Sequence, residues 1–254
     1  MSNWCKRLLV WPRQPMLVGG ALFALLPIAI AQAGESRAID DHQRWQRESA
    51  ATVMTGFWEG VMEPEDERFR RLGPSGGPNL GEFTGLYFTE AGLKKAQTWS
   101  PDDEYLPENI GKSQIVPTIM TTPFPVKFEF GEQQVTIRLT ECDNVRTVAL
   151  SGSPQQKVAA PAEVGTAMGV STGHWDGATL VIRTTGIRAG QVRANGAPQS
   201  ADAVVTERYG LVGGYLVGIL IIEDPLYYTR PVTRVIAYRK RNDLKELEEY
   251  GSCS

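Results

Sequence analysis

The chain has 254 residues, of which 26 are lysine or arginine and 29 are aspartate or glutamate, so its formal net charge is -3. This acidic balance, without a stripe of Lys and Arg interleaved with aromatic residues, argues against a general nucleic-acid-binding surface. The chain has 3 cysteines, too few for a small disulfide-stapled scaffold, so a hydrophobic core has to hold the fold together.

The first 33 residues predict a secretory signal peptide. Lys6 and Arg7 begin a basic region, and an apolar run follows at residues 16–30. Ala31-Gln32-Ala33 then offers small residues around a cleavage site. The apolar run is shorter than the roughly 20 residues that a bilayer span needs. We therefore expect cleavage near Ala33 and a periplasmic or secreted protein with no stable membrane span, and an uncleaved anchor is the alternative.

The cysteines and histidines that remain after cleavage offer little for a metal site. Cys142 and Cys253 could form a disulfide in an oxidising compartment, or stay as two unpaired thiols. The chain has only 2 histidines, His42 and His174, so a His-rich zinc site is not expected. No metal and no cofactor is predicted.

The mature chain of roughly 220 residues suits one domain with a sizeable core. Residues 34–54 predict a polar N-terminal helix, residues 55–240 a single β domain, and residues 241–254 a charged C-terminal helix or tail. Early in the β domain, residues 62–81 predict a loop and residues 83–88 a strand. Thr89 is a plausible N-cap for a short helix that ends at Gln97.

From residue 113 onward the pattern is that of β-strands almost throughout. Apolar and polar residues alternate in short runs, and Gly-containing turns separate the runs. Asp176-Gly177 and Gly213-Gly214 predict two tight hairpins, because these pairs tolerate the positive φ angles of such turns. Residues 186–200 predict a loop. The strand candidates are residues 126–130, 135–139, 145–150, 173–176, 179–185, 201–209, 215–222 and 232–239.

About ten short strands joined mostly by short turns predict a mainly β fold. The expected architecture is an antiparallel lipocalin-like β-barrel, or a sandwich, with an N-terminal helix and a short C-terminal helix. Barrel closure removes exposed strand edges and leaves a lumen that can hold a ligand.

Two family resemblances bear on this fold. Gly56-Phe57-Trp58, followed by many antiparallel strands and a basic last strand with Arg234 and Arg239, is similar to the opening of lipocalin-like (calycin) barrels. That resemblance implies that Trp58 packs near an arginine of the closing strand.

The second resemblance covers most of residues 83–240. These residues resemble a family of secreted bacterial β-proteins that carry G-x-W-x-G-D-T-L-V-V-x-T, then E-R-Y or E-R-F, then D-P-x-x-Y-T-R-P. The chain departs from that pattern at Ala178, where the family has Asp, and at residues 109–112, which lack the family's Cys. The resemblance implies an exported β-protein and no particular reaction. The matching segments are residues 89–92, 99–103, 120–125, 146–147, 173–185, 207–209 and 223–231.

Alternation places three charged residues, Glu207, Arg234 and Glu141, on the apolar faces of predicted strands. We expect them to point into the barrel, where a charge has to be paired or neutralised. One interpretation is a structural ion pair between Glu207 and Arg234 that closes the barrel. The other is a polar anchor or a general acid or base whose pKa is shifted by burial.

Four more residues are candidates for a site. His174 is predicted near a strand end. One interpretation is a proton-transfer residue at the barrel mouth, and the other is a residue that simply packs beside Trp175. Tyr228 and Arg230 lie close together in the chain. They could grip an aromatic or carboxylated ligand, or pack where a strand begins.

The leading hypothesis is an exported barrel that binds a small, partly apolar molecule in its lumen through Arg234, Arg230, Glu141 and Trp175. One alternative is a cofactor-free isomerase, lyase or hydrolase in which Glu207, His174 and Tyr228 transfer protons. Another is an interaction module of an envelope complex. The lack of a Gly-x-Ser-x-Gly elbow argues against a Ser-His-Asp hydrolase. The sequence leaves the ligand, the oligomeric state and the question of catalysis open.

Overall fold

The computed structural model describes residues 26–61, 81–100, 102, 114–141, 144–150, 165–193 and 195–248, with side chains of the first helix from Ile39 onward. Cys142 and Cys253, for which the sequence leaves a disulfide or two free thiols open, lie outside these residues. So do the basic region of the predicted signal peptide and residues 62–80 of the predicted loop. The chain divides into two compact units, Met1–His42 and Gln43–Ser254.

Helix α1 (Leu26–Met54) ends where the sequence predicts but begins at Leu26 rather than at residue 34. Its residues up to His42 belong to the first unit, and the remainder belongs to the second. Within the second unit, Ala50 and Met54 are buried in the hydrophobic core. None of the helices in the described residues is long and apolar enough to cross a membrane.

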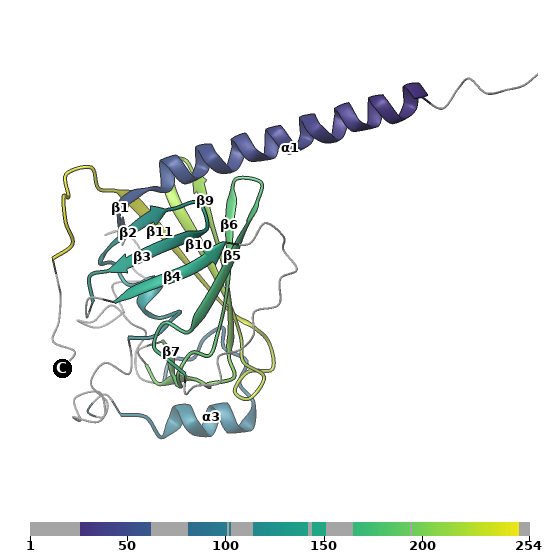
Figure 1. Cartoon of the computed structure of the whole chain (residues 1–254). Helices are drawn as coiled ribbons and strands as arrows, with labels where there is room; N and C mark the ends of the chain where they lie inside the picture. The colour runs from purple at the N-terminus through teal and green to yellow at the C-terminus, as the bar shows by residue number, and fades with distance from the viewer. Residues whose placement is uncertain are drawn as a thin grey trace, which may run out of the picture. The chain divides into compact units, whose positions relative to one another are not determined.

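The predicted barrel is confirmed: among the described residues, nine strands close into one β-barrel (Figure 1). Each strand is hydrogen-bonded to the next around the wall, and the last is paired with the first. In spatial order the strands are β1 (Gly56–Gly60), β11 (Val232–Lys240), β10 (Tyr215–Glu223), β9 (Val204–Val212), β6 (Thr179–Thr185), β5 (Val170–Asp176), β4 (Val145–Leu150), β3 (Gln134–Leu139) and β2 (Pro125–Phe130).

The barrel is mixed and not purely antiparallel, which corrects the expectation from the sequence. Strands β4 and β5 run parallel, with Val148 opposite Ser171, whereas the other neighbours in the wall run antiparallel. Alternation within a strand fixes which residues share a face, but it does not fix the direction of the neighbouring strand. The eight-stranded up-and-down barrels of lipocalins therefore differ from this one in strand number and in direction at this pair.

Two segments differ from their predicted structure. The predicted loop at residues 186–200 contains β7 (Gly190–Arg193) and β8 (Ala197–Gln199), which form a separate two-stranded sheet. The predicted strand at residues 83–88 is absent, and only Phe88 forms a bridge, with Tyr228. A bridge partner from a distant loop could not be recognised in the local pattern.

The two predicted glycine hairpins are confirmed. Asp176 pairs with Thr179, so Gly177 is the first central residue of the turn, with φ 59°. In the second hairpin both central residues, Gly213 and Gly214, have positive φ angles of 57° and 87°. Because a Cβ atom disfavours positive φ, glycine at these positions sets the turn and with it the strand register.

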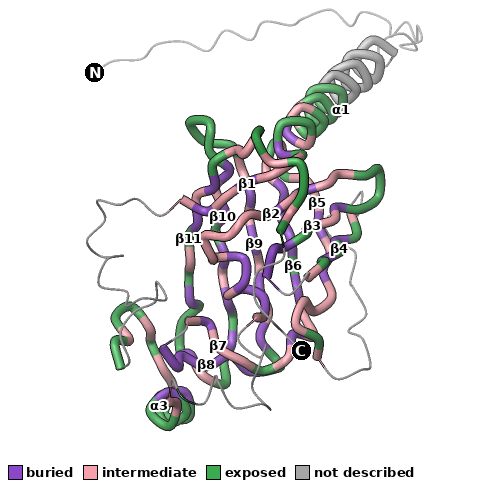
Figure 2. The backbone as a smooth tube through the Cα atoms, turned by 90° about the vertical axis from the view of Figure 1, so that its left-hand side faces the viewer, coloured by how far each residue is buried: buried purple, intermediate pink, exposed green. Residues whose placement is uncertain are grey.

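Buried residues alternate along the barrel strands with more exposed ones (Figure 2), and the buried ones form the hydrophobic core. Trp58, Phe128, Tyr209 and Tyr238 are the large aromatic residues of this core, each 2% exposed or less. The rings of Phe128 and Tyr209 meet edge to face, with centroids 5.5 Å apart. Aromatic side chains from opposite parts of the wall thus occupy the space that the sequence assigned to a ligand.

Trp58 is held at the seam between β1 and β11. Its indole N–H donates to the carbonyl of Met54 at 2.7 Å, and Lys240 Nζ lies 4.5 Å from the ring centroid. The lipocalin resemblance implied an arginine of the closing strand near this ring, but here the cation is a lysine. Arg239, the arginine next to it, pairs with Glu59 instead.

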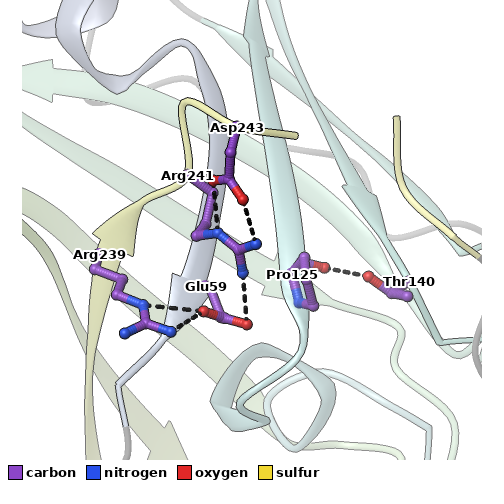
Figure 3. A network of polar contacts seen from close by, with 6 residues as sticks. All are labelled: Glu59, Pro125, Thr140, Arg239, Arg241 and Asp243. Carbon is purple, nitrogen blue, oxygen red and sulfur yellow. Dashed lines mark hydrogen bonds and ion pairs between the residues drawn. The ribbon is translucent and has the colours of Figure 1, made fainter. Parts of the chain in front are cut away.

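A network of charges crosses the same seam (Figure 3). Glu59 accepts hydrogen bonds from Arg239, at 3.0 and 2.5 Å, and lies 2.9 Å from Arg241, which in turn pairs with Asp243. Partial burial opposes ionisation of Glu59, but the two arginines outweigh it and lower its pKa. Residues 241–248 form turns and bends and no helix. The prediction of a C-terminal helix is therefore wrong for residues 241–248, which form a tail, the alternative that the sequence offered.

Helix α3 (Glu90–Gln97) forms as predicted from its cap. The hydroxyl oxygen of Thr89 accepts a hydrogen bond from the backbone N–H of Gly92 at 3.1 Å. The same hydroxyl donates to the carbonyl of Leu226 at 2.7 Å, and Thr89 N–H donates to the carbonyl of Tyr227 at 2.9 Å. The helix start is therefore tied to the loop between β10 and β11.

Candidate functional site

Glu207 lies inside the barrel, as predicted, and is fully buried. Its carboxylate is paired with Arg146 of β4, which is 1% exposed. Tyr209 donates its phenolic proton to the other carboxylate oxygen at 2.8 Å. Arg146 also donates to Ser171 Oγ at 2.9 Å and to Thr184 Oγ1 at 2.6 Å. We call Glu207, Arg146, Tyr209, Ser171 and Thr184 the interior network.

The predicted ion pair between Glu207 and Arg234 is wrong. Leu220 of β10 stands between them in the wall, paired with Glu207 on one side and with Arg234 on the other. The Arg234 guanidinium donates to the carbonyl of Val192 at 2.6 Å rather than to a carboxylate. Arg146 reaches Glu207 across the interior instead. The sequence contained a signal for this pairing, because alternation along β4 puts Arg146 on the same buried face as Val148.

The electrostatics of the interior network are those of a structural ion pair. Burial opposes the charge of Arg146, but Glu207 more than compensates and raises its pKa. Burial and the neighbouring carboxylate raise the pKa of Tyr209 well above its ordinary value, so the phenol keeps its proton. Both carboxylate oxygens of Glu207 are thus engaged by other members of the interior network.

The structure does not bring together the three residues proposed for proton transfer. His174 pairs with Val181, whereas Glu207 pairs with the next residue, Ile182, so the two point to opposite faces of the wall. Tyr228 lies in the loop between β10 and β11 and donates to the carbonyl of Pro198 at 2.7 Å. Burial raises the pKa of Tyr228, which keeps its phenol protonated.

Two of the predicted ligand contacts also lie apart. Trp175 packs on the core with its ring 5.6 Å from that of Phe130. Arg230 is exposed and lies over the ring of Tyr87, 4.6 Å from its centroid. These contacts are accounted for by packing and by a cation–π interaction, respectively.

Glu141, by contrast, lines a pocket. The pocket lies where the ends of β2 and β3 meet the short 3-10 helix η2 (Ile119–Thr121), and it spans about 210 Å³ of atom-free space, which includes open solvent. Its enclosed part has room for about one water molecule. The lining residues are Ile119, Thr122, Phe124, Pro125, Val126, Leu139, Thr140, Glu141 and Tyr238. We call this the Glu141 pocket.

The elements around this pocket are held by hydrogen bonds to the backbone. Thr140 donates its hydroxyl proton to the carbonyl of Pro125, which joins the ends of β3 and β2 (Figure 3). Tyr238 of β11 donates to the carbonyl of Met120 and so fixes η2 against the barrel. The pocket walls therefore come from β2, β3, β11 and η2, which these hydrogen bonds join.

Glu141 is the acidic residue among those that line the pocket. It is 8% exposed, and its Oε2 atom has no hydrogen-bond partner among the described residues. Burial raises the pKa of Glu141, and hydrogen bonds with Thr122 and Gln114 offset only part of this rise. A buried carboxyl oxygen without a partner can accept a hydrogen bond from a bound molecule.

The described residues contain no group of three or more His, Cys, Asp or Glu side chains that could hold a metal ion. A comparison of the chain with protein-family models gave no match, and neither did a comparison with curated proteins.

Proposed function

We propose that this chain is an exported β-barrel protein that binds one small, partly apolar molecule in the Glu141 pocket. The observation that carries the proposal is the buried Oε2 atom of Glu141, which has no hydrogen-bond partner among the described residues and lies in a pocket lined by both polar and apolar residues. The signal-like N-terminus and the resemblance to secreted β-proteins support export.

The pocket defines the class of ligand. The unpartnered carboxyl oxygen needs a hydrogen-bond donor, and an ammonium group also supplies the opposite charge. The apolar side chains of Ile119, Val126 and Leu139 provide contacts for a short hydrocarbon body. The enclosed part has room for a group of about the size of one water molecule, so only the ammonium head of a ligand would lie inside it. A short primary amine whose hydrocarbon body lies in the part open to solvent fits these requirements.

The proposal moves the ligand from the centre of the barrel to its side. Aromatic side chains and the interior network occupy the centre, whereas the Glu141 pocket is partly open to solvent. The alternative of an enzyme that uses Glu207, His174 and Tyr228 receives no support, because these residues lie in three separate places.

Binding of butylamine tests the ligand part of the proposal. We expect saturable binding at pH 7 by isothermal titration calorimetry, and at least a tenfold loss of affinity in Glu141→Gln, which is about 1.4 kcal/mol. Glu132→Gln, at an exposed position in the turn between β2 and β3, is the matched control and should bind as the wild type does. Equal affinity of the two variants would contradict the proposal.

The same titration has a defined pH dependence. Because burial raises the pKa of Glu141, the carboxyl holds its proton to a higher pH than an ordinary glutamate with a value of 4.5. An ammonium ion binds the ionised form, so its affinity should increase as the pH rises through the pKa of Glu141. In the free protein the raised pKa favours the folded state at low pH, and this contribution is lost as the pH rises. Glu141→Gln should remove both pH dependences.

Export is tested on the full-length chain expressed in a bacterial host. We expect the protein in the periplasmic or secreted fraction, with Gly34 as the first residue by N-terminal sequencing. Replacing Lys6 and Arg7 with glutamate should reduce the processed form. Unprocessed protein that remains in the cytoplasm would contradict this part of the proposal without affecting the ligand part.

A further inference from the structure

We infer that the Glu141 pocket selects primary ammonium groups and rejects N-methylated ones, because the described side chains that line it offer hydrogen-bond acceptors and no free hydroxyl proton. This inference rests on the proposed function and adds to it which head groups the pocket rejects. Five of the lining side chains are hydrocarbon, and polar atoms come from the other four, namely Glu141, Thr122, Thr140 and Tyr238.

Backbone carbonyl groups hold two of the three hydroxyl protons. The hydroxyl of Thr140 donates to the carbonyl of Pro125 (Figure 3), and the phenol of Tyr238 donates to the carbonyl of Met120. Burial raises the pKa of Tyr238, so the phenol keeps this proton. Because a hydroxyl group has one proton and two acceptor lone pairs, both oxygen atoms can still accept a hydrogen bond but can no longer donate one.

Two acceptors compete for the third hydroxyl proton. Thr122 donates either to the carbonyl of Ile119, at 3.1 Å, or to the carboxyl group of Glu141. Either hydrogen bond uses the single hydroxyl proton of Thr122. Gln114, which does not line the pocket, forms a further hydrogen bond with the same carboxyl group. Even so, Oε2 of Glu141 has no partner among the described residues and remains available as an acceptor.

A primary ammonium group matches this set of acceptors. It has three N–H donors, no acceptor and a positive charge, so it can donate to Oε2 of Glu141 and to a hydroxyl oxygen at the same time. An alcohol supplies one donor, and its own lone pairs would face the lone pairs of the pocket. A quaternary ammonium group keeps the charge but has no N–H to donate, which leaves the buried carboxyl oxygen without a partner.

The size of the enclosed part of the pocket selects in the same direction. It has room for about one water molecule, and an ammonium head is of similar size. A methyl group on the nitrogen needs more room than this and also replaces one N–H donor. Each methylation therefore removes a hydrogen bond and adds a steric conflict, whereas the positive charge stays the same.

Four ligands with the same butyl group test this inference on the full chain at pH 7: butylamine, N-methylbutylamine, butyltrimethylammonium and 1-butanol. We expect N-methylbutylamine to bind at least about tenfold more weakly than butylamine, and the last two not to saturate in the same concentration range. Equal affinity for butylamine and either methylated cation would mean that charge alone is recognised, which overturns this inference and leaves the proposed function standing. If butylamine itself does not bind, the proposed function fails and this inference fails with it.

Variants of Thr140 test the hydroxyl acceptors directly. Thr140→Val keeps a similar shape without the oxygen, so it should bind butylamine more weakly and discriminate less between butylamine and N-methylbutylamine. Thr140→Ser restores the hydroxyl and should restore both properties. Thr136→Val makes the same change on β3 outside the pocket lining and should behave as the wild type does. Unchanged discrimination in a folded Thr140→Val protein overturns the inference, and if that variant does not fold, the four ligands decide on the wild-type protein.

Discussion

Glu207→Gln is expected to lower the free energy of unfolding by about 3–5 kcal/mol, because it leaves the Arg146 guanidinium buried without its counter-charge. Glutamine keeps the size of the side chain, so the effect comes from charge rather than from a cavity. Arg146 Nη1 is already buried without a hydrogen-bond partner among the described residues, so the network has no other acceptor to offer. Urea denaturation, with the slope checked for two-state behaviour, measures the loss.

The adjacent residue of β9 provides a matched control. Arg208 points to the outer face and pairs with Asp176 at 2.6 Å, and the two side chains are 41% and 61% exposed. Because exposed ion pairs contribute about 0–1 kcal/mol, Asp176→Asn should have a small effect. Similar losses in the two variants would contradict the structural interpretation of Glu207. So would a Glu207→Gln protein of unchanged stability.

A double variant separates charge from packing in the interior network. Replacing both partners, as in Arg146→Met with Glu207→Leu, removes the buried charges together and leaves apolar side chains of similar length. We expect the double variant to recover much of the stability that Glu207→Gln loses. If the double variant loses as much stability as the single variants Arg146→Met and Glu207→Leu lose together, the two residues do not act on each other.

Gly92→Ala is expected to destabilise the protein by about 1–3 kcal/mol, although alanine is the better helix former by about 1 kcal/mol. Gly92 is the third residue of α3, and it lies against the loop between β10 and β11. A Cβ atom there would be 2.1 Å from the carbonyl oxygen of Tyr227 and 2.9 Å from its carbonyl carbon. Because these atoms belong to the backbone, they cannot rotate away, and α3 or the loop has to move. That movement would weaken the hydrogen bonds that Thr89 donates to the loop carbonyls.

Gly210→Ala is the control for this substitution. A Cβ atom at Gly210 of β9 would have its nearest neighbour, Thr179 Oγ1, at 3.8 Å, which is an ordinary contact distance. We expect Gly210→Ala to leave stability unchanged or to increase it slightly, because alanine reduces the freedom of the unfolded chain. Thermal and urea unfolding of both variants measure the contrast. A stabilised Gly92→Ala protein would show that α3 does not pack on Tyr227 as described.

Local features of the chain were predictable because they depend on neighbours in sequence. The glycine hairpins at Gly177 and at Gly213-Gly214 follow from the φ angles that a tight turn requires. Helix α3 follows from its cap at Thr89, and β4 has the predicted limits. Alternation also placed Glu207 on the inner face of β9, because successive side chains of a strand point to opposite sides.

What the sequence by itself determined is therefore most strands of the barrel wall, their inner faces and a mainly β fold. The tertiary structure decided which residues meet: Arg146 and not Arg234 pairs with Glu207, because the closed barrel turns the inner face of β4 toward that of β9 while Arg234 donates to the carbonyl of Val192. It also decided that β4 and β5 run parallel, and that η2 closes over Glu141 to make a pocket. These contacts join residues far apart in the chain, and no local preference specifies them.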